Sequence, residues 1–188
     1  NQGPMFAKPG LVELLMRAGG EGETEEIKEA ALGALANLAE ADNNCGPMFT
    51  KPGLVELLMR AADKGETSEV KEEGLRALAS LASAADNLVP MFAKPGLVEV
   101  LMRVGDKGET SETKRLGLRA LANLAYAADN QAPMFAKPGL VEMLMRAADK
   151  GETSEVKRQG LMALVNLAAV EDNKVLMFSK PGLVDVLL

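Results

Sequence analysis

The sequence predicts an all-α fold, a solenoid of three-helix repeats with a period of 43 residues. The run Ala-Leu-Ala-Asn-Leu-Ala at residues 34–39 returns at 120–125, and close variants stand at 77–82 and 163–168. A constant period of this length is typical of stacked helical units. Hydrophobic residues make up 47% of the chain but aromatic residues only 3%. Alanine, leucine and methionine must therefore fill the core, and these are good helix formers.

The period divides the whole chain, residues 1–188, into one array that we expect to be a single domain. The repeats are residues 4–46, 47–89, 90–132 and 133–175, with a partial fifth repeat at 176–188. One phenylalanine is constant in all five copies, as Phe6, Phe49, Phe92, Phe135 and Phe178. A constant apolar position of this kind indicates the core.

The first helix of each repeat is predicted to be short. An Asp-Asn pair such as Asp129-Asn130 can cap its start. Pro133 then falls within the first turn, where its missing N–H costs little. The Lys-Pro-Gly sequence at residues 137–139 should end the helix, because proline disfavours helix at the residue before it and glycine permits a sharp turn.

The second helix is predicted at Leu140–Ala147 in the fourth repeat. Its apolar residues fall at helical spacing, which predicts a largely buried helix: Leu140, Val141, Leu144 and Met145. Glu142 and Arg146 lie four residues apart in the favourable order, which predicts an exposed ion pair worth about 0.2–0.5 kcal/mol. The same pair recurs as Glu13–Arg17, Glu56–Arg60 and Glu99–Arg103.

The third helix follows a turn rich in glycine, aspartate and glutamate, and we expect it at about residues 154–170 in the fourth repeat. Thr153 can cap it. In the first repeat, the apolar stripe expected to face the core comprises Ile27, Ala30, Ala31, Ala34, Leu35 and Leu38. Glu29 and Gly33 lie opposite that stripe, and Asn37 lies at its edge.

The positions that vary between the repeats concentrate on this third helix. Eight residues before the asparagine position they are Glu29, Glu72, Arg115 and Arg158. Four residues before it they are Gly33, Arg76, Arg119 and Met162, and three residues after it they are Glu40, Ser83, Tyr126 and Ala169. These residues are helical neighbours, so they form a variable stripe on a constant frame, which favours modular recognition. Drift on a tolerant solvent face is the alternative interpretation.

The pattern resembles the armadillo repeat family, with HEAT repeats as a near relative. The motifs are Gly-Leu-Val-Glu-Leu-Leu at residues 10–15 and the third-helix run Ala-Leu-Ala-Asn-Leu-Ala, and the resemblance covers the whole chain. It implies a right-handed α-solenoid of three-helix armadillo-type repeats whose third helices line a concave groove. In that family the asparagine commonly holds the backbone of an extended peptide. This role falls here on Asn37, Asn123 and Asn166, with Ser80 as a shorter substitute.

The same asparagines have other possible roles. Their side chains offer both a donor and an acceptor, so they can also bond locally or tie adjacent repeats together. The importin-like subfamily places a tryptophan four residues before the asparagine. Here those positions hold Gly33, Arg76, Arg119 and Met162, so the aromatic slots that grip lysine are absent. The resemblance therefore does not favour a nuclear-import role.

Charge along the stripe suggests which peptide would bind. Arg76, Arg115, Arg119 and Arg158 should lie toward the middle and C-terminal part of the groove, with Glu29 and Glu72 toward its N-terminal part. We expect acidic or phosphorylated peptide residues opposite the arginines, since arginine binds such groups in a bidentate manner. A solvated pattern of mutually compensating charges is the alternative. Tyr126 and Met162 complete the predicted peptide-binding residues.

Composition argues against several other functions. The net charge of −6 does not suit a nucleic-acid partner. The chain has no histidine and a single cysteine, Cys45, so we expect no enzyme, no metal site and no cofactor. No apolar run is long enough for a membrane helix. The lone cysteine and the lack of a signal peptide favour an intracellular, cytoplasmic protein.

A structural role is the second hypothesis. The array begins with a bare first helix and ends on the apolar residues Val186, Leu187 and Leu188. Uncapped ends would expose apolar surface and favour end-to-end association into a homo-oligomer. The near-identical repeats and a first residue other than methionine also fit a fragment, or a designed or consensus scaffold without a natural ligand.

Overall fold

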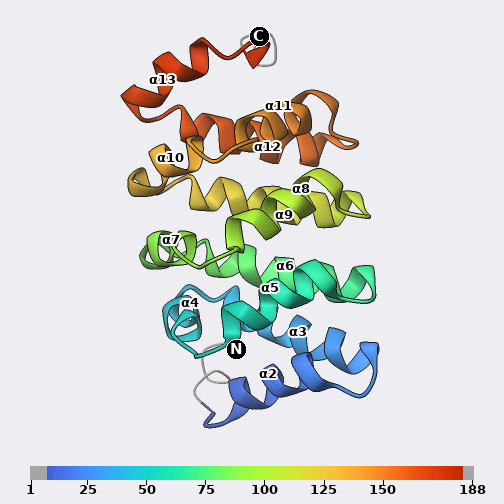
Figure 1. The fold of residues 1–188 in the computed structure, drawn as a ribbon. Helices are drawn as coiled ribbons and strands as arrows, with labels where there is room; N and C mark the ends of the chain where they lie inside the picture. The colour runs from blue at the N-terminus through green and yellow to red at the C-terminus, as the bar shows by residue number, and fades with distance from the viewer. Residues whose placement is uncertain (1–7, 184–188) are drawn as a thin grey trace. The chain divides into compact units, whose positions relative to one another are not determined.

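The computed structural model describes residues 8–183, and every regular element within them is a helix (Figure 1). The second helices of the repeats are α2 (Leu11–Glu21), α5 (Leu54–Lys64), α8 (Leu97–Lys107) and α11 (Leu140–Lys150). The third helices are α3 (Glu25–Ala39), α6 (Ser68–Leu81), α9 (Ser111–Leu124) and α12 (Ser154–Leu167). The short first helices are α4 (Asp42–Phe49), α7 (Ala85–Phe92), α10 (Ala128–Phe135) and α13 (Glu171–Phe178). The predicted all-α class and three-helix repeat are confirmed.

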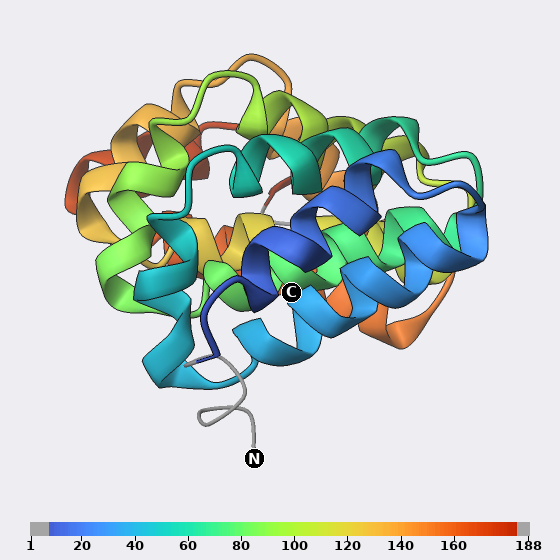
Figure 2. The same cartoon turned by 90° about the horizontal axis from the view of Figure 1, so that it is seen from below.

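The chain divides into two compact units, Asn1–Asn87 and Leu88–Leu188. In unit 1, α3 packs against α2 and α6, and α6 also packs against α5 (Figures 1 and 2). In unit 2, α9 packs against α8 and α12, and α12 also packs against α11. Each third helix therefore lies beside its own second helix and beside the other third helix of its unit.

Leucine and alanine form the core of the third helices, but the buried stripe of α3 differs from the predicted one. Leu35 and Leu38 are buried as expected, whereas Ile27 and Ala30 are exposed. Leu32, Ala36 and Ala39 are buried in their place. The reason is that α3 has two covered sides, one against α2 and one against α6. A single stripe derived from periodicity describes only one of them.

Glycine turns and threonine caps fix the starts of the second and third helices. The glycine of each Lys-Pro-Gly turn has a φ of 77–81°, a left-handed conformation that other residues adopt only with strain. Thr24, Thr67, Thr110 and Thr153 each accept a hydrogen bond from the backbone N–H three residues on. The predicted turn and cap are both confirmed. The second helix α11 runs to Lys150, three residues beyond its predicted end at Ala147. The third helix of the same repeat, α12, ends at Leu167 rather than at residue 170.

The short helices start differently from the prediction. In α10 the N-cap residue is Ala127, which makes no side-chain cap bond, and Asn130 lies inside the helix. Pro133 therefore occupies the sixth helical position, beyond the first turn. The predicted cap by the Asp-Asn pair is wrong because the asparagine side chain is used in the core. The first helix predicted in residues 4–7, with Phe6, and the apolar end at Val186–Leu188 lie outside the described residues.

Candidate interaction surface on the third helices

A buried asparagine in each short helix ties neighbouring helices together. Asn130 Nδ2 donates to the carbonyl oxygens of Leu124, at 2.9 Å, and Leu88, at 3.0 Å. Asn44, Asn87 and Asn173 are buried at the same position, and each donates to the carbonyl six residues before it. Asn87 and Asn173 also reach a carbonyl 42 residues back, in the preceding short helix. Sequence analysis missed this role, although the exact recurrence of the asparagine was visible.

The glutamates of the second helices bind lysines of the next repeat. Lys51 Nζ lies 2.6 Å from Glu13, Lys137 lies 2.5 Å from Glu99, and Lys180 lies 2.5 Å from Glu142. These lysine hydrogen bonds lower the pKa of each of the three glutamates. Arg146 instead pairs with Asp106 at 2.8 Å. Glu142 and Arg146 therefore form no direct ion pair within their helix, because stacking brings closer partners to both side chains, and the Arg146 charge makes only a smaller contribution to the lowered pKa of Glu142.

In unit 1 the structure brings Asn37 and Arg76 together on adjacent third helices. Arg76 Nη1 donates to Asn37 Oδ1 at 2.6 Å and to Glu40 at 2.9 Å. Its Nε and Nη2 donate to Glu73 at 2.9 Å and 2.6 Å. Asn37 is exposed, but its amide oxygen is already bound.

The other predicted residues of unit 1 differ in accessibility. Ser80 is buried on α6, so its short side chain does not reach the surface. Glu29 lies on α3 and Glu72 on α6, and both are partly exposed.

In unit 2 the arginines fall into two groups. Arg115 donates to Glu112 and Arg158 donates to Glu155, each three residues back on the same helix. These hydrogen bonds lower the pKa of both glutamates. Within the part of the chain that the structure describes, Arg119 makes no side-chain hydrogen bond or ion pair. It is half-buried on α9.

The remaining positions of unit 2 combine polar and apolar side chains. Asn166 Nδ2 donates to the Ala122 carbonyl oxygen of α9 at 2.8 Å, which ties α12 to α9. Asn123 is half-buried. Tyr126 is 73% exposed and Met162 is 45% exposed. Exposed Tyr126 and Met162 and half-buried Arg119 thus lie on, or just beyond the end of, the adjacent third helices α9 and α12.

Structures of known proteins match the fold over nearly the whole chain. An engineered protein of known crystal structure is 30% identical, with a TM-score of 0.82, over 94% of this chain and 70% of its own. A designed armadillo repeat protein solved in complex with the peptide (KR)4 is 23% identical, with a TM-score of 0.80, over 98% of this chain and 73% of its own. The crystal structure of computationally designed armadillo repeat proteins for modular peptide recognition matches at 22% identity with a TM-score of 0.79, over 98% of this chain and 73% of its own. The chain has an armadillo-like repeat fold. No protein-family model and no curated protein matches the sequence.

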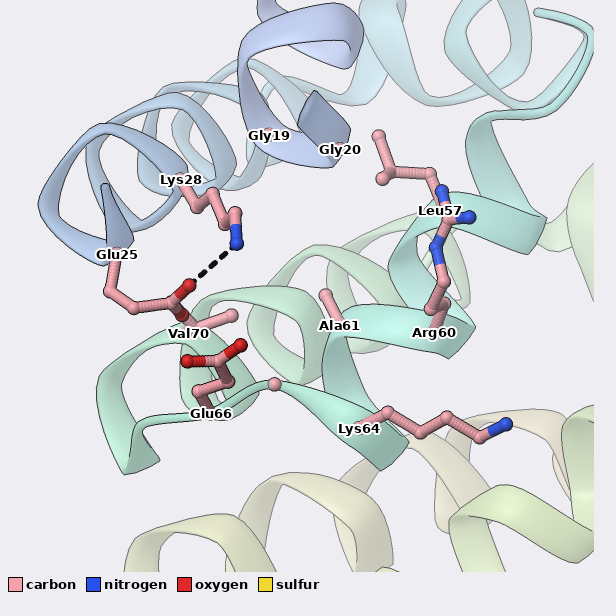
Figure 3. A pocket seen from close by; sticks show the side chains of 11 residues that line it. Gly19, Gly20, Glu25, Lys28, Leu57, Arg60, Ala61, Lys64, Glu66 and Val70 are labelled. Carbon is pink, nitrogen blue, oxygen red and sulfur yellow. Dashed lines mark hydrogen bonds and ion pairs between the residues drawn. The ribbon is translucent and has the colours of Figure 1, made fainter. Parts of the chain in front are cut away.

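Pockets in the armadillo-like units lie away from the variable stripe. In unit 1 a cavity of about 130 Å³ is lined by the ends of α2 and α5 and the start of α3, with Lys28, Arg60 and Glu66 around it (Figure 3). In unit 2 a cavity of about 200 Å³ lies at the corresponding positions, 86 residues later. No residue of the variable stripe lines either cavity.

The armadillo-like core also contains the single cysteine. Cys45 is fully buried, and its Sγ donates to the Ala39 carbonyl oxygen at 3.0 Å. Burial raises the pKa of the thiol, which disfavours the nucleophilic thiolate. Among the described residues no cluster of three or more histidine, cysteine or acidic side chains is placed to hold a metal ion. No helix in residues 8–183 is long and apolar enough to cross a membrane.

Proposed function

We propose that this protein is a peptide-binding scaffold, and that its third helices in unit 2 bind an extended peptide or partner segment. The observation that carries the proposal is Arg119, which lacks an intramolecular acceptor among the described residues. It shares α9 with Asn123, four residues on, and Tyr126 follows at the end of the helix. Met162 occupies the position of Arg119 in the next repeat and is exposed.

The chemistry of these side chains favours a peptide that carries both a negative charge and an apolar residue. Arginine donates two parallel hydrogen bonds to a carboxylate or phosphate. Tyr126 and Met162 offer large, adaptable contact surface to an apolar side chain. Asn166 keeps its amide oxygen for a peptide N–H, because only its Nδ2 is bound to Ala122.

Arg115 and Arg158 contribute less to the proposed site. Each already pairs with a glutamate three residues before it, and such pairs on one helix are weak enough to exchange. In unit 1, Glu29 and Glu72 add negative charge, which disfavours acidic ligands there. The acidic or phosphorylated partner is therefore proposed for unit 2.

A charge reversal at Arg119 tests this function. The probe is a panel of fluorescent extended peptides that alternate acidic and apolar residues, with basic peptides of matched length. We expect Arg119→Glu to weaken binding of the best acidic peptide by about tenfold or more, since a charged hydrogen bond contributes about 1.5–3 kcal/mol. Arg60→Glu is the control with the same charge change, because Arg60 is an exposed arginine that lines the unit 1 cavity, away from the variable stripe. Equal losses in both variants, or no binding of any acidic peptide, would contradict the proposal.

Self-association through the ends is a second candidate function, favoured by apolar positions that only the end repeats expose. Leu14 is 51% exposed, whereas Leu57 at the same position of the next repeat is buried. Val165 is 57% exposed, whereas the corresponding Ala36 and Ala122 are buried. Light scattering across protein concentration measures the effect: a mass that rises with concentration and returns to the monomer in Val165→Glu supports association. A constant monomer mass would exclude it.

A further inference from the structure

The guanidinium of Arg76 is surrounded by acceptors from its own unit. Nη1 donates to Asn37 Oδ1 at 2.6 Å and to Glu40 Oε1 at 2.9 Å. Nε and Nη2 both donate to Glu73 Oε2, at 2.9 Å and 2.6 Å, and Nη2 also donates to the Gly33 carbonyl oxygen at 3.3 Å. A guanidinium has five N–H donors, and these five hydrogen bonds match that number. The acceptors therefore satisfy the whole planar group.

Most of this acceptor set belongs to the neighbouring helix rather than to the helix of Arg76. Gly33 and Asn37 lie four residues apart on α3, and Glu40 follows at the helix end, so helical spacing places them on one side. The remaining acceptor, Glu73, lies on α6, the helix of Arg76 itself. Glu40 and Glu73 each carry one negative charge, so the acceptors have a net charge of −2 when Arg76 is removed. Such a cluster favours a cation with several planar donors, which is a guanidinium rather than an ammonium group.

The same arginine position elsewhere in the chain lacks these acceptors. Arg119 follows Arg76 by one period, but Leu116 stands three residues before it in place of Glu73. The residues one period after Asn37 and Glu40 are Ser80 and Ser83. The repeat frame therefore does not require the acceptor set, which is specific to the α3–α6 surface.

We propose that α3 and α6 form a binding site for a guanidinium group, such as the side chain of an arginine in a peptide, and that Arg76 occupies this site from within the chain. The tethered Arg76 has a high effective concentration, so it excludes arginine-bearing ligands from unit 1. Arg76 thus determines the charge preference of this surface. The site lies on unit 1 and is independent of the acidic-peptide surface proposed for unit 2.

Chemical rescue tests the site without a peptide. The probe is ethylguanidinium, which reproduces the end of an arginine side chain, at millimolar concentrations well below those that denature proteins. In Arg76→Ala we expect the thermal midpoint to rise with the probe and to saturate, while ethylammonium gives a smaller rise. Arg119→Ala is the matched control, and we expect no saturable rise in it or in the wild type. Equal responses of Arg76→Ala and Arg119→Ala would overturn the proposal.

Two further measurements keep the test decisive if Arg76→Ala folds poorly. In the wild type, NMR should show slower hydrogen exchange at Nε of Arg76 than at Nε of Arg119, and the double change Glu40→Gln with Glu73→Gln should remove the difference. Equal exchange rates in the wild type would contradict the proposed occupancy. A peptide that alternates arginine and alanine should bind Arg76→Ala about tenfold or more tightly than it binds the wild type, which corresponds to about 1.4 kcal/mol. Equal affinity would count against the site, whatever the outcome for acidic peptides at unit 2.

Discussion

Neighbouring asparagines in α4 have opposite environments, which shows how far one residue's role depends on its place in the stack. Asn43 is exposed, whereas Asn44 is buried and donates from Nδ2 to the Leu38 carbonyl oxygen at 2.8 Å. A buried carbonyl that loses its donor keeps the full cost of desolvation. The buried asparagine is therefore a structural residue, and the exposed one is not.

We predict that Asn44→Ala lowers the free energy of unfolding by about 1–3 kcal/mol, because the buried Leu38 carbonyl oxygen loses its 2.8 Å donor and keeps only the longer hydrogen bond from the Ala41 N–H, at 3.4 Å. Asn43→Ala should change it by less than about 0.5 kcal/mol, as surface substitutions usually do. Urea denaturation followed by circular dichroism measures both variants. Similar midpoints for the two variants would contradict the assigned role of Asn44.

At the scale of the helix, two glycines differ in the backbone conformation that they adopt. Gly139 precedes α11 with φ at 79°, and an added Cβ would have no atom within 4 Å. Gly46 lies inside α4 with an ordinary backbone and the same open surroundings. Sterics with neighbours are thus absent at both, and only the backbone conformation differs.

This difference predicts substitutions of opposite sign. Gly139→Ala should destabilise the protein by about 1–2 kcal/mol, because an L residue is strained in the left-handed region. Gly46→Ala should stabilise it by about 0.5–1 kcal/mol, because alanine loses less backbone entropy in a helix. Pro47 follows this position, but Ala132 precedes Pro133 at the corresponding position inside α10, so the helix accommodates alanine there. Thermal unfolding monitored by circular dichroism gives both shifts. A destabilised Gly46→Ala would show that α4 does not adopt the described helix.

For the whole molecule, stability should be distributed over the repeats, because in an array each repeat mainly contacts its neighbours. The single thiol reports on unit 1 alone. Cys45 is buried in α4, and its Sγ donates to the Ala39 carbonyl oxygen at the end of α3, at 3.0 Å. The thiol can react only when this part of unit 1 opens.

We predict that the native thiol reacts with a disulfide reagent far more slowly than the urea-unfolded thiol. Asn44→Ala should accelerate the native reaction by about tenfold or more, since about 1.4 kcal/mol of lost local stability gives a factor of ten. Asn130→Ala, the corresponding change in unit 2, is the control and should accelerate it less. Equal acceleration by the two variants would mean that both units open together.

The local elements of the fold could be predicted from the sequence because their signals act over a few residues. The threonine caps such as Thr153 and the Lys-Pro-Gly turn at residues 137–139 are of this kind, and the 43-residue period repeats them along the chain. Backbone conformation and first-turn hydrogen bonds depend on residues at most four positions away. The all-α class and the repeat follow from these signals together with the apolar periodicity.

The partners of the polar side chains were decided only by the tertiary structure. The local sequence predicts that Asn130 caps a helix. In the structure, its side chain instead donates to the Leu88 carbonyl oxygen, 42 residues before it. The sequence predicts Arg76 as a ligand contact. In the structure, its guanidinium instead donates to Asn37, 39 residues before it, and to Glu40, 36 residues before it. Stacking brings residues about one period apart within hydrogen-bond distance, and the geometry of that contact is absent from any local pattern. The sequence by itself determined the helices and their repeat, and the packing of one repeat on the next decided which side chains remain available to a partner.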